Sequence, residues 1–233
     1  MRTMQKIVAL LVIVTGLCGF SVNADTNTQG NALEGKRIVV IGDSYVENHS
    51  RPWSESWHAR AAKRLGMYYL NFGRNGSCIA FDRTKEGFGE AMTKRYLKMP
   101  SEADYVLVIA GHNDAFTVGK DPSQMDVFKA SLEKFLTGLQ QRYPDAAIGY
   151  VLPWHLKRAG FEEVISEIRT ACSRHSIPVF DAGADCGIEV NDDGFRAKYF
   201  QNKGVGDTAH LNAAGHALVV DKGVAFIKSL SRK

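Results

Sequence analysis

The chain has 233 residues and a formal net charge of +4, from 29 Lys and Arg against 25 Asp and Glu. This length predicts one domain with a sizeable core, because single hydrophobic cores stop growing near about 250 to 300 residues. A charge so near neutral gives no argument for a nucleic-acid partner, which requires a concentrated basic stripe, and we expect none.

The N-terminal residues have the three parts of a secretory signal peptide. Arg2 and Lys6 form the basic region, residues 7–20 the apolar region, and Val22-Asn23-Ala24 a cleavage site of small residues. We expect residues 1–24 to be removed, which lowers the charge to +2, and the mature chain to be exported to the periplasm or secreted. The apolar region is shorter than the ~20 residues that cross a bilayer, so we expect no stable membrane insertion; an uncleaved anchor is the alternative.

Residues 25–35 are polar and rich in Asn, Thr, Gly and Gln, which predicts a flexible lead-in to a domain spanning residues 36–233. Five short apolar runs occur in this domain. Each is nearly continuous and rich in Val, Ile or Tyr, as is typical of strands buried on both faces. They cover residues 37–41, 68–72, 105–110, 147–152 and 178–181.

Segments with helical spacing separate these runs. The apolar residues that recur at this spacing are Trp57, Ala61 and Leu65; Phe128, Leu132, Phe135 and Leu139; Phe161, Ile165 and Ile168; and Leu218, Val219, Val224 and Ile227. Strands that alternate with helices predict right-handed crossovers and a parallel sheet covered on both sides. The predicted fold class is therefore α/β, a three-layer α/β/α sandwich with a central, mostly parallel five-stranded sheet.

Three polar motifs directly follow the first three runs. They are Gly42-Asp43-Ser44, Asn71-Phe72-Gly73-Arg74-Asn75-Gly76 and Gly111-His112-Asn113-Asp114. Ligands of open parallel sheets lie outside the carboxyl ends of the strands. We therefore expect Ser44, Gly76 and Asn113 to meet at one edge of the sheet.

A fourth motif, Asp207-Thr208-Ala209-His210, precedes the last helical segment. Asn212 is a suitable N-cap for that helix, and the loop leading into it can bring His210 back over Ser44. A serine hydroxyl is a poor nucleophile until a base takes its proton, and a carboxylate orients that base. Taken singly, the motifs are also typical of turns and helix caps, with Gly76 as a turn glycine and Asn113 as a cap.

The four motifs, in this order, resemble the four blocks of the SGNH, or GDSL-type, hydrolase family. That family carries Ser in G-D-S, Gly in N-x-G-x-x-G, Asn in G-x-N-D and His in D-x-x-H. The resemblance implies the family's flavodoxin-like fold and a catalytic triad of Ser44 as nucleophile, His210 as general base and Asp207 as its orienting partner. It also implies an oxyanion hole formed by the backbone N–H groups of Ser44 and Gly76 and the side-chain amide of Asn113.

Other polar residues have less specific roles. We expect Asp43 and Asp114 to brace their loops by accepting backbone hydrogen bonds. The histidines outside the motifs are expected at the surface or satisfied in the core; among them are His49, His58, His175 and His216.

No C-x-x-C, H-E-x-x-H or Walker-type motif is present, so the sequence implies neither a metal nor a nucleotide cofactor, and we expect no cofactor. Beyond the leader the cysteines are Cys78, Cys172 and Cys186, an odd number. Export permits a disulfide between Cys172 and Cys186, and three reduced thiols are the alternative.

Residues after the strands indicate the substrate class. Trp154 and His155 follow the fourth run and lie near the same sheet edge, where Trp154 either stacks on a sugar ring or packs in the core. Arg74 and Arg83 flank the second motif and either meet a substrate carboxylate or are simply solvated. His112 either lines the pocket or faces solvent.

A long-chain lipase requires an extended apolar lid or trough, and no long loop of this chain is strongly apolar. The sequence therefore predicts an exported serine esterase acting on a small-molecule or glycan ester, which removes acetyl or other short acyl groups from carbohydrate. A lysophospholipase- or thioesterase-like lipid esterase of the same family and a non-catalytic glycan-binding protein on this fold are the alternatives. The sequence does not indicate the oligomeric state.

Overall fold

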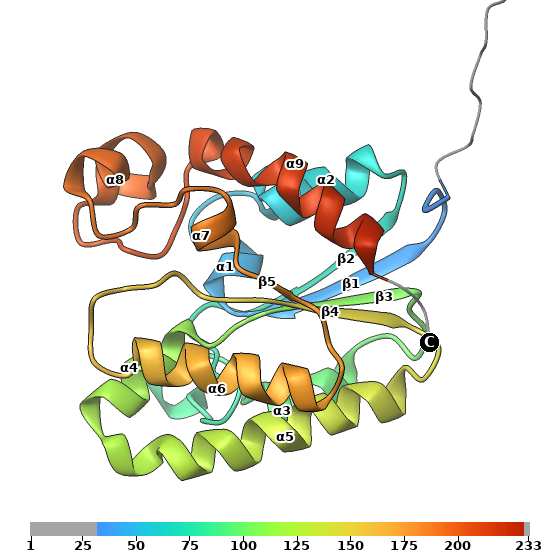
Figure 1. Cartoon of the computed structure of the whole chain (residues 1–233), viewed down its shortest axis with the longest axis horizontal. Helices are drawn as coiled ribbons and strands as arrows, with labels where there is room; N and C mark the ends of the chain where they lie inside the picture. Colours follow the sequence, from blue (N-terminus) through green and yellow to red (C-terminus); the bar gives the residue numbers. More distant parts are fainter. Residues whose placement is uncertain (1–31, 231–233) are drawn as a thin grey trace, which may run out of the picture. The chain divides into compact units, whose positions relative to one another are not determined.

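A parallel sheet of five strands lies at the centre of residues 32–230, the part of the chain that the computed structural model describes (Figure 1). The strands lie in the order β2-β1-β3-β4-β5, and each neighbouring pair is parallel. They are β1 (Arg37–Gly42), β2 (Tyr68–Gly73), β3 (Tyr105–Ile109), β4 (Ala147–Val151) and β5 (Val179–Phe180). The five predicted apolar runs are these five strands, and no end is displaced by more than one residue.

The two strands that carry the first and third motifs are buried on both faces. In β1, Ile38 and Ile41 have no exposed surface, and in β3 neither Val106 nor Val108 has any. Helices cover both faces of a parallel sheet, so its central strands are continuously apolar rather than alternating. Gly42 pairs in register with Gly73 and Ile109, so these three strands end at the same level.

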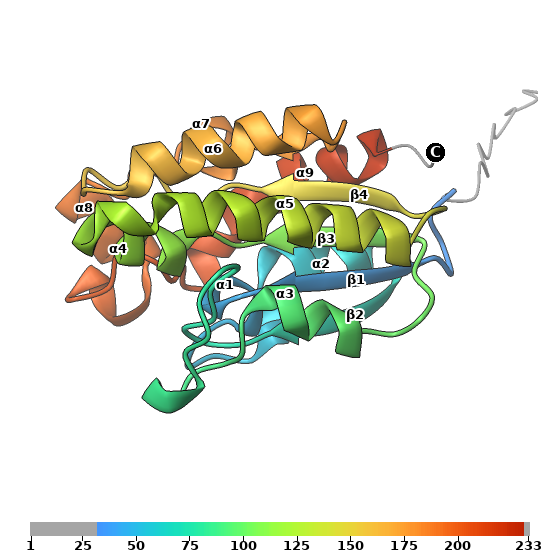
Figure 2. The ribbon, with the colours of Figure 1, turned by 90° about the horizontal axis from the view of Figure 1, so that it is seen from below.

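Helices lie on both faces of the sheet, as predicted. Figures 1 and 2 show α2, α7 and α9 on one face and α3, α4, α5 and α6 on the other. The α-helices are α1 (Ser44–Glu47), α2 (Trp57–Arg64), α3 (Met92–Arg95), α4 (His112–Lys120), α5 (Met125–Arg142), α6 (Phe161–Arg174), α7 (Ala182–Asp185), α8 (Asp193–Tyr199) and α9 (Ala213–Ser229). Short 3₁₀ helices are η1 (Trp53–Glu55), η2 (Thr84–Glu86), η3 (Tyr96–Lys98), η4 (Pro122–Gln124) and η5 (Gln201–Gly204). The predicted three-layer α/β/α architecture is confirmed.

Two other expectations concern the N-terminus and the cysteines. The predicted signal peptide, residues 1–24, and the lead-in as far as residue 31 lie outside the described residues. Within residues 32–230, no helix is both long enough and apolar enough to cross a membrane. Cys78, Cys172 and Cys186 are free thiols, which is the second of the two alternatives.

The loop between η5 and α9 carries the fourth motif, and one side chain closes it. Asn212 Oδ1 accepts hydrogen bonds from the backbone N–H groups of Ala214 and Gly215 at 2.9 and 3.0 Å, which makes it the N-cap that the sequence predicted. Its Nδ2 donates to the carbonyl oxygens of Lys198 and Phe200 at 2.9 and 3.1 Å. Asn212 therefore ties the start of α9 to the other end of the loop.

We predict that Asn212→Ala lowers the free energy of unfolding by about 1 to 2 kcal/mol, because a helix loses its cap and two carbonyl groups lose their donor. Asn212→Asp keeps the capping oxygen but places its second oxygen against the two carbonyl oxygens, so it is also less stable than the wild type. Urea denaturation of the two variants and the wild type measures the difference. Equal stability of the alanine variant and the wild type would contradict this role of Asn212.

Candidate active site

Ser44 is the first residue of the short helix that follows β1. Its predecessor Asp43 caps this helix, since Asp43 Oδ1 accepts the N–H of Tyr45 at 2.9 Å. This turn reverses the chain directly beyond the carboxyl end of the sheet. Ser44 is 8% exposed, so its hydroxyl lies at the base of a depression rather than on an open surface.

The structure brings Ser44, His210 and Asp207 into one hydrogen-bonded chain. His210 Nε2 lies 2.8 Å from Ser44 Oγ, although the two residues are 166 positions apart. The other ring nitrogen, Nδ1, lies 2.9 Å from Asp207 Oδ2. This is the arrangement of a nucleophile, a base and a carboxylate that orients the base.

The carboxylate of Asp207 is held in its charged form. Burial alone raises the pKa of Asp207, but the hydrogen bond and charge of His210 and two backbone N–H groups outweigh it and lower the pKa below its ordinary value. The N–H groups of Ala209 and His210 both donate to Oδ1 at 2.9 Å. Oδ1 therefore holds the loop through these two hydrogen bonds, and Oδ2 remains to orient the imidazole.

Gly76 follows β2, and Asn113 lies in the first turn of α4 after β3; both strands neighbour β1. Gly76 has φ +68°, and a Cβ there would lie 2.2 Å from the ring of Phe88, so both the backbone angle and the space require glycine. The backbone N–H groups of Ser44 and Gly76 donate to no acceptor within residues 32–230.

The amide of Asn113 is already engaged. Its Nδ2 donates to Asp43 Oδ2 at 3.3 Å and to the Ser77 carbonyl oxygen at 3.2 Å, and both bonds are long. An oxyanion beside Ser44 therefore has to replace one of these two oxygens as the acceptor of an Asn113 N–H group. The long distances make this exchange inexpensive, because hydrogen bonds weaken as they lengthen.

A hollow of about 520 Å³ opens beside His210 and Asp207. His112 lines this hollow, which decides between the two alternatives for that residue. Its ring is buried, its Nδ1 shares a 2.8 Å hydrogen bond with Tyr45 Oη, and burial lowers its pKa to about 3. His112 is therefore a neutral wall of the hollow at ordinary pH.

Trp154 does not offer a face to a sugar ring. It is only 4% exposed, its ring packs 5.1 Å from that of Tyr45, and its indole N–H donates to the Ala209 carbonyl oxygen at 2.8 Å. The stacking alternative is corrected: Trp154 packs in the core, because its hydrogen bond inside the Asp207–His210 loop draws the ring inward.

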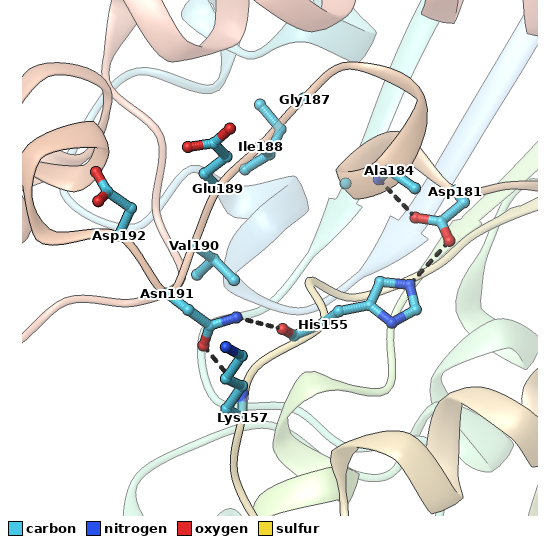
Figure 3. Close-up of a pocket in the computed structure, with 11 residues that line it drawn as sticks. His155, Lys157, Asp181, Ala184, Gly187, Ile188, Glu189, Val190, Asn191 and Asp192 are labelled. Atoms are coloured by element: carbon cyan, nitrogen blue, oxygen red, sulfur yellow. Dashed lines mark hydrogen bonds and ion pairs between the residues drawn. The ribbon is translucent and has the colours of Figure 1, made fainter.

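His155 and the arginines of the second motif lie away from the hollow beside His210. His155 lines a separate hollow of about 660 Å³, where its Nε2 lies 2.8 Å from Asp181 Oδ2 (Figure 3). Arg83 pairs with Glu86 and donates to the Gly76 carbonyl oxygen at 3.0 Å. Arg74 is exposed and does not line the hollow beside His210.

No three His, Cys, Asp or Glu side chains within residues 32–230 are grouped so that they could hold a metal ion.

The model of the GDSL-like lipase/acylhydrolase family matches residues 40–218, a stretch that contains all four motifs. The chain belongs to this family. It is accordingly a hydrolase. None of the curated proteins compared with it matches it.

Solved structures share the fold of this hydrolase. A protein from Lactobacillus plantarum is 24% identical, with a TM-score of 0.70 over 84% of this chain and 98% of its own. The acetylxylan esterase Axe2 from Geobacillus stearothermophilus is 15% identical, with a TM-score of 0.60 over 83% of this chain and 95% of its own. A member of the lipolytic G-D-S-L family from Veillonella parvula is 16% identical, with a TM-score of 0.59 over 83% and 99%. At these identities the likeness shows a shared fold.

His49 is a residue of the hydrolase site that the sequence did not reveal. Its ring stacks on that of His210, with centroids 4.3 Å apart and planes 11° apart. His49 is exposed, as the sequence predicted, but its contact with His210 was not predicted. The stacking depends on φ values of +69° at Asn48 and +49° at His49, which turn the chain back over the site and leave no pattern in the sequence.

The two buried aspartates of the motifs brace loops, as expected. Asp114 accepts the N–H groups of Ile79 and Ala80 at 2.9 and 3.0 Å and so holds the loop that contains Gly76. Asp43 accepts from Tyr45 and Asn113. Burial outweighs these bonds and raises the pKa of Asp43 from 3.8 to about 7 and that of Asp114 to about 6.

The raised pKa of Asp43 predicts a specific dependence of stability on pH. The folded enzyme keeps a proton that the unfolded chain releases above about pH 3.9. The contribution of Asp43 to stability is therefore full below that pH and is lost as the pH rises through about 7. Asp43→Asn cannot titrate, and we expect its free energy of unfolding to fall less than that of the wild type between about pH 4 and pH 7.

Urea denaturation at a series of pH values measures this difference. The exposed Asp145 offers a matched control, since Asp145→Asn removes one acid without changing the buried site. Parallel pH curves for Asp43→Asn and the wild type would show that Asp43 is ionised throughout.

Proposed function

We propose that the protein is an exported serine esterase that removes acetyl or other short acyl groups from carbohydrate through an acyl-enzyme. The 2.8 Å distance between His210 Nε2 and Ser44 Oγ, with Asp207 on the other ring nitrogen, is the observation that carries this proposal. Family membership supports ester hydrolysis.

In the first step Ser44 Oγ attacks the ester carbonyl carbon while His210 Nε2 takes the hydroxyl proton. The carbonyl electrons move to the oxygen, which becomes an oxyanion. The N–H groups of Ser44 and Gly76 and the amide of Asn113 are the donors available to it. Asp207 keeps the proton on Nδ1 and stabilises the imidazolium that forms. Loss of one oxyanion donor typically costs roughly 100- to 1000-fold in rate.

In the second step the tetrahedral intermediate collapses. The bond to the leaving alcohol breaks, and His210 Nε2 returns its proton to the alcohol oxygen. A water molecule then attacks the acyl group on Ser44, again losing a proton to His210. The carboxylic acid leaves, and the proton returns to Ser44 Oγ.

Two observations support a short acyl group on a polar alcohol. The hollow beside His210 is lined by imidazole, guanidinium, amide and hydroxyl groups as well as the ring of Phe116, so it is not an apolar trough for a long chain. The acetylxylan esterase Axe2 is built on the same fold. The N-terminal sequence supports export, and the mass of the protein recovered from the periplasm or medium tests cleavage after Ala24.

We predict that Ser44→Ala lowers kcat for p-nitrophenyl acetate by about 10⁴-fold or more, because no other group can form the acyl-enzyme. Ser101→Ala, an exposed serine away from the site, is the control and keeps wild-type activity. Stopped or continuous assays of released p-nitrophenol give the rates. Undiminished hydrolysis by Ser44→Ala would falsify the mechanism, and a wild type inactive on every ester would favour the glycan-binding alternative.

We also predict that kcat/KM falls from p-nitrophenyl acetate to octanoate and to palmitate, because polar side chains interrupt the apolar surface of the hollow. The three esters share one leaving group, so their order reports the acyl site alone. A rate that rises toward palmitate would instead identify a lipid esterase.

A further inference from the structure

Arg158 lies at the hollow beside His210 without an acidic partner. It belongs to the segment between β4 and α6, it lines the same hollow as His210, and its guanidinium carbon lies 5.4 Å above the centre of the Phe116 ring. Within residues 32–230 its guanidinium makes no hydrogen bond and no ion pair. Arg169 and Arg174, on the neighbouring helix α6, both pair with acids.

The backbone of Arg158 is fixed. Its N–H donates to the Leu156 carbonyl oxygen at 2.8 Å in a tight turn. The next residues lie directly on α4: Gly160 has φ +86°, and a Cβ at Gly119 would lie 2.1 Å from the Ala159 carbonyl oxygen. A backbone held so closely fixes the point from which the Arg158 side chain extends toward the hollow.

Arg158 is the only Lys or Arg side chain among the described residues that line the hollow. Asp207 is the only acid among the described residues that line it, and His210 and two backbone N–H groups already use both of its oxygens. Burial lowers the pKa of both His49 and His112, so these rings are neutral near pH 7. An anionic group on the substrate is thus the missing partner of Arg158.

We propose that Arg158 binds a carboxylate on the alcohol part of the substrate, so that the enzyme acts on acylated acidic sugars such as uronic acids. This inference rests on the proposed function. The planar guanidinium matches a carboxylate with two parallel hydrogen bonds, and the Phe116 ring lies beneath the guanidinium. Arg158 is a specificity-determining residue, and the group it recognises lies apart from the ester that reacts.

A matched pair of substrates tests the inference. The pair is an O-acetylated galacturonic acid glycoside and its carboxyl methyl ester, which differ in one charge, and acetate release is measured for both. For the wild type we expect kcat/KM on the free acid to exceed that on the methyl ester by about 10- to 100-fold, the usual worth of a charge-assisted hydrogen bond. The difference should lie mainly in KM, because the carboxylate is bound equally in the ground and transition states.

Arg158→Met should remove this preference, so that its kcat/KM ratio for acid over methyl ester falls to about one. Arg158→Lys keeps the positive charge but lacks the two parallel N–H donors of the guanidinium, so it should retain only part of the preference. Lys157→Met is the matched control: it loses the same charge one residue away, at the separate hollow of Figure 3, and should keep the wild-type ratio.

Two results would overturn the inference: a wild type that does not distinguish the acid from its methyl ester, or an equal loss of preference in Lys157→Met and Arg158→Met. Hydrolysis of p-nitrophenyl acetate by the wild type separates this failure from that of the proposed function. An enzyme active on p-nitrophenyl acetate without preference for the acid remains an esterase with another substrate.

Discussion

The hydrogen bond between His210 and Ser44 joins two segments that leave the sheet 166 residues apart, and much of the surrounding structure holds them together. The Ser44 side is rigid because β1 lies between β2 and β3 in the sheet. The His210 side is a loop, and it is held at both ends by Asn212 and in its middle by the indole N–H of Trp154 on the Ala209 carbonyl oxygen. Because a misplacement of about 1 Å in a catalytic site can cost roughly 100-fold in rate, these remote contacts bear directly on the geometry of the three side chains.

The protonation states of the carboxyl groups at the site also depend on where each group lies. Two carboxyl groups act on His210, and their surroundings separate them. Asp43 is fully buried, and burial raises its pKa to about 7, whereas the hydrogen bonds at Asp207 lower its pKa despite partial burial. Asp207 thus stays charged at lower pH than Asp43 and is the group that stabilises an imidazolium. Asp43 serves mainly as an acceptor that caps α1 and holds Asn113.

The sequence predicted the sheet and the convergence of the motifs from apolar patterns and strand order. It did not predict features that depend on how loops pack against one another. Strands buried on both faces leave continuous apolar runs, and parallel strands bring their carboxyl ends together, so the positions of Ser44, Gly76 and Asn113 followed from spacing. Helix α4 was missed because its buried face contains His112 and Asp114 in place of apolar residues. Trp154, His49 and Arg158 depend on how loops fold against one another, and residue type alone does not indicate whether an aromatic or basic side chain points inward, stacks or remains unpaired.

Backbone strain is concentrated around the hollow. Of the five non-glycine residues with positive φ in residues 32–230, four lie in its two facing loops: Asn48 and His49 after α1, and Asn202 and Lys203 in η5. Such conformations cost energy and persist only where neighbouring contacts determine them. Here Asn48 Oδ1 contacts His216 Nε2 at 3.0 Å, and Ser50 Oγ donates to Gln201 Oε1 at 3.0 Å, which joins the two loops. The stacking of His49 on His210 thus occurs on a backbone that these contacts fix, although the His49 side chain itself is exposed.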